Sequence, residues 1–172
     1  MNERKGAAAF EGNPLTLVGP ELKVGDAAPD FTVTANDLAP ASLADYKGKV
    51  VIVASVPSLD TPVCDMETRR FNTEAAALGD DVVILTVSMD LPFAQSRWCG
   101  AAGVEAVKTL SDHKDASFGL GWGALIKELR LLTRAVFVLD RKGTIAYVQY
   151  LKEITEEPDY AAALDAARKL VG

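Results

Sequence analysis

The most constraining feature of this sequence is an almost uninterrupted apolar, largely β-branched run from Val50 to Val56. Apolar residues at nearly every position, rather than at alternate ones, are typical of a strand buried on both faces of a parallel sheet. A second such run, Val82 to Ser88, follows a helical segment that extends to about Leu78. This order predicts a βαβ unit with a right-handed crossover, and therefore an α/β fold.

Further elements are expected on both sides of this unit. Gly and Asn-Pro in the segment 11–14 predict the turn of an N-terminal hairpin, and Arg141-Lys142-Gly143 predicts a second hairpin. Pro158-Asp159 opens a final helix with one apolar side. The other boundaries that we predict are strands Ala8–Phe10, Leu15–Val18, Phe31–Thr34, Val107–Leu110, Arg134–Asp140 and Thr144–Leu151, and a helix Leu91–Ala102 that stops near Gly103.

The length of 172 residues fits one domain, expected to span residues 1–172 with its hairpin at about residues 8–18. The net charge is −6, from 18 basic and 24 acidic residues, so we expect neither nucleic acid nor a membrane surface as a partner. No apolar run approaches the roughly 18 to 20 residues of a membrane span, and the N-terminus lacks the apolar stretch of a secretory signal. We therefore expect a cytoplasmic protein.

Cysteine and histidine are scarce in this chain. It has two cysteines, Cys64 and Cys99, and a single histidine, His113. With no Cys-x-x-Cys pair and one imidazole, a zinc site is disfavoured, and we expect no metal and no cofactor. A hydrolase of the Cys-His or Ser-His-Asp kind would need His113 as its base. In a reducing compartment, two cysteines serve either as inert packing or in transient redox chemistry.

Cys64 is predicted to lie in the first turn of a helix. Thr61 is a favourable N-cap residue and Pro62 a favourable first helical residue. A stripe spaced at helical intervals from Cys64 predicts that the thiol faces the sheet; its members are Thr68, Phe71, Ala75 and Leu78.

A reactive thiol at this position needs help from its surroundings. A free thiol is mostly protonated at neutral pH, and the thiolate is the nucleophile. The helix N-terminus contributes only about 0.3 to 1 kcal/mol, or about 2 kcal/mol where it is partly buried. The nearby acids Asp65 and Glu67 act in the opposite direction. A reactive Cys64 therefore requires a fixed cation beside it.

The spacing of Pro57, Thr61 and Cys64 after a buried strand resembles the active-site loop of the peroxiredoxins. The segments 12–14, 91–99 and 153–160 narrow the resemblance to the bacterial thiol peroxidases, and it runs from about residue 10 to the C-terminus. The resemblance implies a thioredoxin-like fold, with a central mixed sheet flanked by helices and an N-terminal β-hairpin.

The resemblance also implies roles for individual residues. Cys64 would be the peroxidatic cysteine, Pro57 would shield its thiolate, and the Thr61 hydroxyl would hydrogen-bond the sulfur and the peroxide. The conserved arginine of the family matches Arg134, which would be the missing cation. In the borrowed topology, the Arg134 strand runs antiparallel to its neighbours and begins beside the start of the Cys64 helix.

Cys99 matches the resolving cysteine, which would condense with the Cys64 sulfenic acid into an intrachain disulfide. If Pro92 opens a helix, Cys99 lies about 10 Å along it. A disulfide tolerates Cα atoms no more than about 7 Å apart. We therefore predict that the reduced fold holds the two sulfurs apart, and that one or both segments must unwind to join them.

The resemblance further implies reduction of hydrogen peroxide and alkyl hydroperoxides, thioredoxin as the electron donor, and a homodimer. The apolar residues Leu91, Pro92, Phe93, Leu131 and Leu132 would line the substrate mouth, or would simply be packing residues.

Other interpretations stay open from the residues alone. A general disulfide oxidoreductase lacks its usual Cys-x-x-Cys motif here, whereas a redox sensor or binding module would use the same two cysteines without turnover. Either cysteine could instead be a small buried hydrophobe. We expect His113 to be a solvated loop residue, and the aromatic side chains of Phe93, Trp98 and Trp122 to pack. No role could be derived for Ser88, Asp90 or Gln95.

Overall fold

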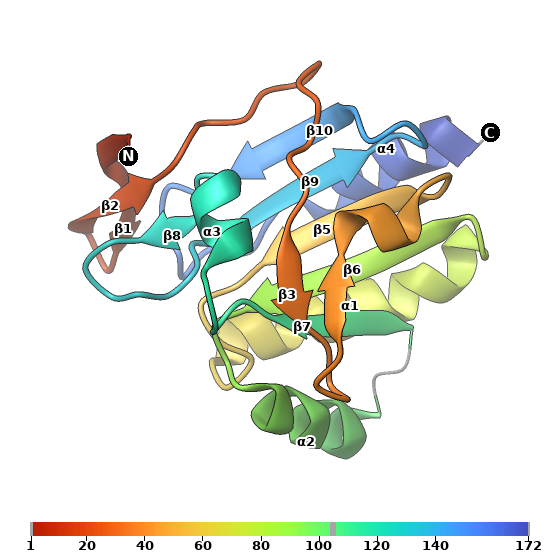
Figure 1. Cartoon of the computed structure of the whole chain (residues 1–172), viewed down its shortest axis with the longest axis horizontal. Coiled ribbons are helices and arrows are strands. Elements are labelled where there is room, and N and C mark those ends of the chain that lie inside the picture. Colours follow the sequence, from red (N-terminus) through yellow and green to blue (C-terminus); the bar gives the residue numbers. More distant parts are fainter. Residues whose placement is uncertain (1, 104–105, 172) are drawn as a thin grey trace.

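The computed structural model describes residues 2–103 and 106–171, without the side chains of residues 75 and 76. The expected helices and strands are present, with small shifts at their ends (Figure 1). In chain order the elements are β1 (Glu3–Phe10), β2 (Asn13–Val18), β3 (Thr32–Thr34), β4 (Pro40–Ser42), the 3-10 helix η1 (Leu43–Tyr46), β5 (Val50–Ser55), α1 (Pro62–Leu78), β6 (Val82–Ser88), α2 (Pro92–Ala102), β7 (Val107–Ser111), α3 (Ser117–Gly121), β8 (Leu125–Ile126), β9 (Ala135–Leu139), β10 (Ile145–Tyr150) and α4 (Tyr160–Val171).

The central sheet is mixed, in the order β10-β9-β5-β6-β7-β3-β4. Strands β5, β6 and β7 are parallel, which confirms the predicted βαβ unit. Strand β9 pairs antiparallel with β5, and β10 pairs antiparallel with β9, as predicted for the second hairpin. The predicted α/β class with a central mixed sheet is therefore confirmed.

Burial of β5 on both faces explains its apolar run. Val50, Ile52 and Ala54 belong to a core cluster that includes residues of α1 and α4. Val51 and Val53 point to the other face, where the cluster contains aromatic residues from β9 and α3. Figure 1 shows α1 and α4 on one side of the sheet and α3 on the opposite side. Both faces are thus covered, and neither face of β5 can accept a polar side chain without cost.

Four short elements were not predicted, namely β4, η1, α3 and β8. They contain 3, 4, 5 and 2 residues, which is too short to show a periodic pattern. Strand β8 extends the predicted hairpin into a separate three-stranded sheet, β1-β2-β8, at one end of the molecule (Figure 1). The hairpin is also longer than predicted, because β1 begins at Glu3.

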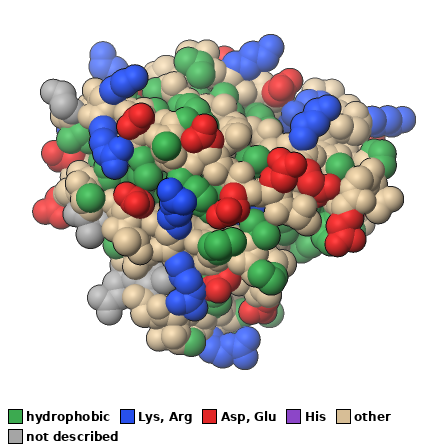
Figure 2. Space-filling model, turned by 180° about the vertical axis from the view of Figure 1, so that it is seen from behind, with side chains coloured by type: hydrophobic (Ala, Val, Ile, Leu, Met, Phe, Trp, Pro, Cys, Tyr) green, Lys and Arg blue, Asp and Glu red, His purple; other side chains and the backbone are tan. Residues whose placement is uncertain are grey.

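In the part of the chain that the structure describes, no helix is both long and apolar enough to cross a membrane. Figure 2 shows the face behind the view of Figure 1, where basic and acidic side chains are interspersed and hydrophobic side chains are scattered among them. This mixture agrees with the small net charge of −6.

One edge of the sheet collects the chemistry-bearing segments. The carboxyl ends of the parallel strands β5 and β6 lie together there, since their residues pair in register from Val50 with Val82 to Ser55 with Val87. The chain leaves this edge into α1 and α2. Strand β9 runs the other way and begins at the same edge, with Ala135 opposite Ser55.

Candidate active site

Helix α1 begins where the sequence predicts. Thr61 has extended backbone dihedrals, and its hydroxyl oxygen accepts a hydrogen bond from the Cys64 backbone N–H at 3.3 Å. The same hydroxyl donates to the carbonyl oxygen of Ser58 at 3.0 Å. Its single proton is therefore directed to the loop, so in this structure Thr61 acts as an N-cap.

The Cys64 side chain is fully buried, with an exposed fraction of 0%. It packs in a small apolar cluster with Val56 and Leu59, against which Trp98 of α2 also rests. The predicted inward direction of the helical stripe is confirmed for Thr68, Phe71 and Leu78, which are all buried. The side chain of Ala75, also predicted to lie in the stripe, is outside the described residues.

Arg134 supplies the cation that the sequence requires. Its Nη2 donates to the sulfur of Cys64 at 3.0 Å, and its Nε donates to the carbonyl oxygen of Ile154 at 2.8 Å. The guanidinium is almost fully buried, at 1% exposed, one residue before β9. A buried positive group that points a donor at the sulfur favours the thiolate over the thiol.

Cys99 has a different environment on α2. It is half-buried, and its sulfur lies 3.2 Å from the Thr109 hydroxyl oxygen. That hydroxyl donates to the side-chain oxygen of Asn36 at 3.2 Å. Cys99 also borders a surface hollow of about 380 Å³. Neither cysteine is in a disulfide, and the two sulfurs have separate partners.

No role for Asp90 could be derived from the sequence, yet its carboxylate holds the loop that precedes Cys64. It accepts hydrogen bonds from the Ser58 hydroxyl at 2.7 Å and from the Leu59 N–H at 2.8 Å. It also accepts from the Ser88 hydroxyl at 2.7 Å. Each donor fixes the loop relative to the end of β6.

Gln95 joins α2 to the same group of residues. Its side-chain nitrogen donates to the Ser88 hydroxyl at 3.0 Å and to the Leu110 carbonyl oxygen at 2.9 Å. Ser88 and Gln95 are fully buried. The loop of Cys64 and the helix of Cys99 are therefore tied through Asp90, Ser88 and Gln95, an arrangement that depends on tertiary contacts no local pattern reveals.

Comparison with known proteins places this site in a family. A family model described as redoxin matches residues 23–164. The chain belongs to the redoxin family. Among redoxin relatives, a thiol peroxidase of Bacillus subtilis is 60% identical, over 94% of this chain and 96% of that protein. A thiol peroxidase of Oceanobacillus iheyensis is 58% identical, over 93% of this chain and 97% of that protein.

Solved structures agree with this placement of the redoxin chain. The crystal structure of a peroxiredoxin-like protein from Aquifex aeolicus has a TM-score of 0.90 and 43% identity, and the match covers 97% of each chain. A thiol peroxidase from Chromobacterium violaceum shares the fold, with a TM-score of 0.84 at 16% identity over 94% of this chain and 95% of that chain. The fold is therefore thioredoxin-like, and this redoxin is a thiol-dependent peroxidase of the peroxiredoxin type.

The two acids near Cys64 are less harmful to a thiolate than the redoxin sequence suggests. The Asp65 carboxylate is turned away into a hydrogen bond from Trp98 Nε1 at 3.0 Å and an ion pair with Arg69 at 2.9 Å. Glu67 is fully buried beside Arg134, and its burial raises its pKa to about 8 although the Arg134 charge acts in the other direction. A neutral Glu67 does not repel a thiolate.

The apolar residues expected at the redoxin substrate mouth separate into two groups. Leu91 and Phe93 are 56% and 69% exposed, beside the start of α2. Pro92 and Leu132 are buried, and Leu131 packs against the cluster beneath the hairpin. Leu132 therefore belongs to the core and does not face an open mouth, because its side chain is enclosed together with Leu125.

Three further expectations concern aromatic side chains and the histidine. Trp122 packs in the core and Trp98 is half-buried, as predicted. Phe93 is not packed as predicted, since it is 69% exposed. His113 is half-buried rather than fully solvated, and its Nδ1 lies 2.9 Å from the Ser111 hydroxyl oxygen.

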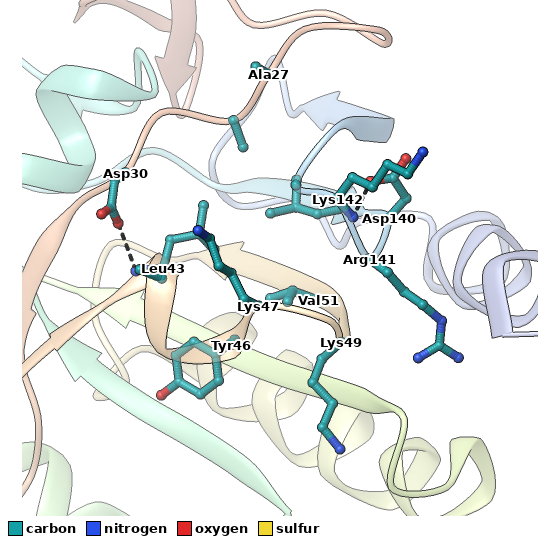
Figure 3. A pocket seen from close by; sticks show the side chains of 14 residues that line it. Ala27, Asp30, Leu43, Tyr46, Lys47, Lys49, Val51, Asp140, Arg141 and Lys142 are labelled. Atoms are coloured by element: carbon teal, nitrogen blue, oxygen red, sulfur yellow. Dashed lines mark hydrogen bonds between the residues drawn. The ribbon is translucent and has the colours of Figure 1, made fainter.

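A hollow of about 250 Å³ at the opposite edge of the sheet contains several basic side chains (Figure 3). Lys49 and Arg141 point away from the centre of the hollow (Figure 3). Lys49 Nζ donates to the Asp80 carbonyl oxygen at 2.7 Å, and Arg141 Nη1 donates to the Gly48 carbonyl oxygen at 3.1 Å. Their charges do not converge on a ligand. Within residues 2–103 and 106–171, no three His, Cys, Asp or Glu side chains form a group that could hold a metal.

Proposed function

We propose that this redoxin reduces hydrogen peroxide and organic hydroperoxides through Cys64. The thiolate attacks one peroxide oxygen, the O–O bond breaks, Cys64 becomes a sulfenic acid, and the released oxygen takes a proton to give water or an alcohol. The contact that carries this proposal is the 3.0 Å hydrogen bond from Arg134 Nη2 to the Cys64 sulfur. The same guanidinium offers further donors to the negative charge that develops on the leaving oxygen.

Two neighbours complete the proposed peroxide site. Pro57 is buried two residues after the end of β5, and it would shield the sulfur from water. Thr61 would contact the incoming peroxide through its hydroxyl, which requires that hydroxyl to rotate away from the Ser58 carbonyl oxygen that it now contacts at 3.0 Å. Catalysis in this proposal depends on four residues together, namely Pro57, Thr61, Cys64 and Arg134.

Cys99 is the proposed resolving residue. It would attack the Cys64 sulfenic acid, form the disulfide and release water. The separate partners of the two sulfurs support a step in which a segment unwinds first. Helix α2 is the better candidate, because Pro92 and Gln95 are its only buried residues among those described.

The exposed apolar pair Leu91 and Phe93 supports two further parts of the proposal. Next to the start of α2, they would favour organic hydroperoxides with an alkyl part, while the buried Leu132 and the hairpin-packed Leu131 would support the site only as packing residues. The same pair would be covered in a homodimer, since exposed side chains of this size are typical of interfaces. Sedimentation of wild type and of Phe93→Asp measures whether this surface pairs in solution.

The reductant of this redoxin is a thiol, and we propose that it is thioredoxin. Thioredoxin would reduce the Cys64–Cys99 disulfide by thiol exchange, in a cytoplasmic setting that keeps such donors reduced. We also propose that residues 1–172 act as a single domain, in which the β1-β2-β8 sheet packs on the segment around Ile154.

The test is peroxide consumption with thioredoxin and its reductase. Wild type is expected to consume many equivalents, Cys64→Ser none, and Cys99→Ser a single equivalent with the sulfenic acid retained. Turnover by Cys64→Ser would contradict the assignment. A wild-type protein that stops after one equivalent would instead be a redox sensor.

A further inference from the structure

Glu67 is a buried acid that the peroxide chemistry above leaves unexplained. It lies three residues after Cys64, on the same side of α1, and its side chain has no exposed surface. One carboxyl oxygen, Oε2, is 3.5 Å from Arg134 Nη1, and the other, Oε1, has no hydrogen-bond partner. A buried carboxylate normally gathers several donors, so this sparse arrangement suits an uncharged carboxylic acid.

The charges around Arg134 lead to the same conclusion. Its guanidinium lies between two acidic groups, the Cys64 sulfur at 3.0 Å and the Glu67 carboxyl at 3.5 Å. One buried cation can neutralise only one buried anion, and a second anion would leave uncompensated charge in the core. A Cys64 thiolate therefore favours a protonated Glu67, and loss of the thiolate charge favours an ionised Glu67 paired with Arg134.

The other charged groups near Glu67 also oppose its ionisation. Burial is the main cause that raises the pKa of Glu67 to about 8, and the charge of Glu157 adds to it, while Arg134 acts in the opposite direction. Tyr160 of α4 donates its hydroxyl to Glu157 at 3.1 Å, and the Arg70 guanidinium lies over the Tyr160 ring at 4.4 Å from its centroid. Among the described neighbours, Arg134 is the cation that contacts the Glu67 carboxyl directly.

We propose that Glu67 is the proton reservoir of the peroxide step. It releases its proton and becomes a carboxylate as the Cys64 sulfur loses its negative charge. Before the reaction, Cys64 is a thiolate and Glu67 a carboxylic acid. The thiolate takes an OH unit from the hydroperoxide, the O–O electron pair leaves with the alkoxide, and the alkoxide gains one proton while Glu67 gives one up. Cys64 is then a neutral sulfenic acid, and Arg134 pairs with the Glu67 carboxylate.

Glu67 contacts Arg134 and not the reacting atoms, so it is a positioning residue that balances the charge of Arg134. This inference rests on the proposed role of Cys64, and it adds a statement about where the proton comes from. If Glu67 supplies the proton, oxidation of Cys64 takes none from the solvent. If Glu67 is replaced by a group that cannot ionise, each oxidation must take one proton from the solvent.

The experiment counts protons during a single oxidation. In weakly buffered neutral solution with an indicator dye, the Cys99→Ser protein reacts with one equivalent of hydrogen peroxide, and mass spectrometry measures oxygen added to Cys64. We expect no net proton uptake for Cys99→Ser and for its Glu74→Gln control, whose changed acid lies partly exposed on the same helix. The protein that carries both Cys99→Ser and Glu67→Gln is expected to take up one proton for each sulfenic acid formed.

Equal proton counts with and without Glu67 would overturn the inference, while absence of oxygen on Cys64 would overturn the proposed function instead. Difference infrared spectroscopy on the Cys99→Ser protein provides an independent measurement that needs no change at position 67. Loss of a protonated-carboxyl band on oxidation is expected, and an unchanged carboxyl region would contradict the inference.

Discussion

The two cysteines of this redoxin lie in environments that are opposite in hydrogen-bond direction. The Cys64 sulfur receives a hydrogen bond from the Arg134 guanidinium. The Cys99 sulfur faces the Thr109 hydroxyl, whose one proton goes to the Asn36 side-chain oxygen. With that proton directed to Asn36, the hydroxyl oxygen is left to accept from the Cys99 thiol. The Arg134 contact therefore favours an anionic sulfur at Cys64, whereas the Thr109 contact favours a thiol at Cys99.

The helices that carry the two cysteines differ as well. Helix α1 has 17 residues, begins at a capped N-terminus and buries Cys64, Glu67, Thr68 and Phe71. Helix α2 has 11 residues, buries only Pro92 and Gln95 among those described, and ends at Gly103, whose φ of 67° is readily adopted by glycine. A capped helix with several buried side chains around Cys64, and a shorter helix with two buried residues around Cys99, suit a cycle in which the second moves to the first.

Removal of Arg134 should have the largest effect on this contrast. Arg134→Gln is expected to lower the rate constant for Cys64 oxidation by about 10³-fold, because the thiolate and the leaving oxygen lose their donor together. Stopped-flow measurement of sulfenic acid formation in the Cys99→Ser background tests this. Arg141→Gln, on the opposite edge of the sheet, is the control and should leave the rate unchanged.

Glu67 gives the Cys64 site a pH-dependent stability. Its pKa is about 8 in the folded protein and near 4.5 when unfolded, so between these values the folded state binds a proton that the unfolded state lacks. Stability therefore falls as the pH rises through this window. Glu67→Gln removes the titration, and its advantage in unfolding free energy over wild type should grow by on the order of 3 kcal/mol from pH 5 to pH 8. Denaturant unfolding across this pH range measures the difference, and a constant difference would contradict a neutral Glu67.

Loosening α2 should change the Cys99 side alone. Gln95→Leu removes the two hydrogen bonds that tie α2 to Ser88 and Leu110. Unwinding of α2 then costs less, and disulfide formation after oxidation should become about tenfold faster, while the rate of Cys64 oxidation stays the same. Rapid-quench trapping separates the two steps, with Ser96→Ala on the exposed side of α2 as the control. A slower peroxide step would show that Gln95 supports the Cys64 site instead.

Thr109→Val should have the smallest effect on the difference between the two cysteines. It keeps the shape of the side chain and deletes the hydroxyl that lies 3.2 Å from the Cys99 sulfur. Alkylation of Cys99 in the reduced Cys64→Ser protein should rise about threefold, since one weak hydrogen bond is lost. Mass spectrometry of the alkylated protein follows this rate. An unchanged rate would mean that burial, rather than Thr109, protects the thiol.

Most of the fold and part of the candidate site could be predicted from local sequence patterns. The apolar runs, the Thr61-Pro62 cap and the stripe from Cys64 depend on neighbours along the chain, so they could be predicted. The resemblance added Arg134, which is 70 residues away from Cys64 and would not follow from spacing. Asp90, Gln95, Thr109 and Asn36 act through contacts between separate elements, and the neutral state of Glu67 depends on its burial. None of these has a local signal.

Ultraviolet absorbance of the thiolate, compared between the Cys64→Ser and Cys99→Ser proteins at neutral pH, shows whether Cys64 is the ionised sulfur. One thiolate per chain is expected when Cys64 alone remains, and essentially none when Cys99 alone remains. Thiolate absorbance from Cys99, or a Cys64 that ionises only in alkaline solution as a free thiol does, would contradict this expectation.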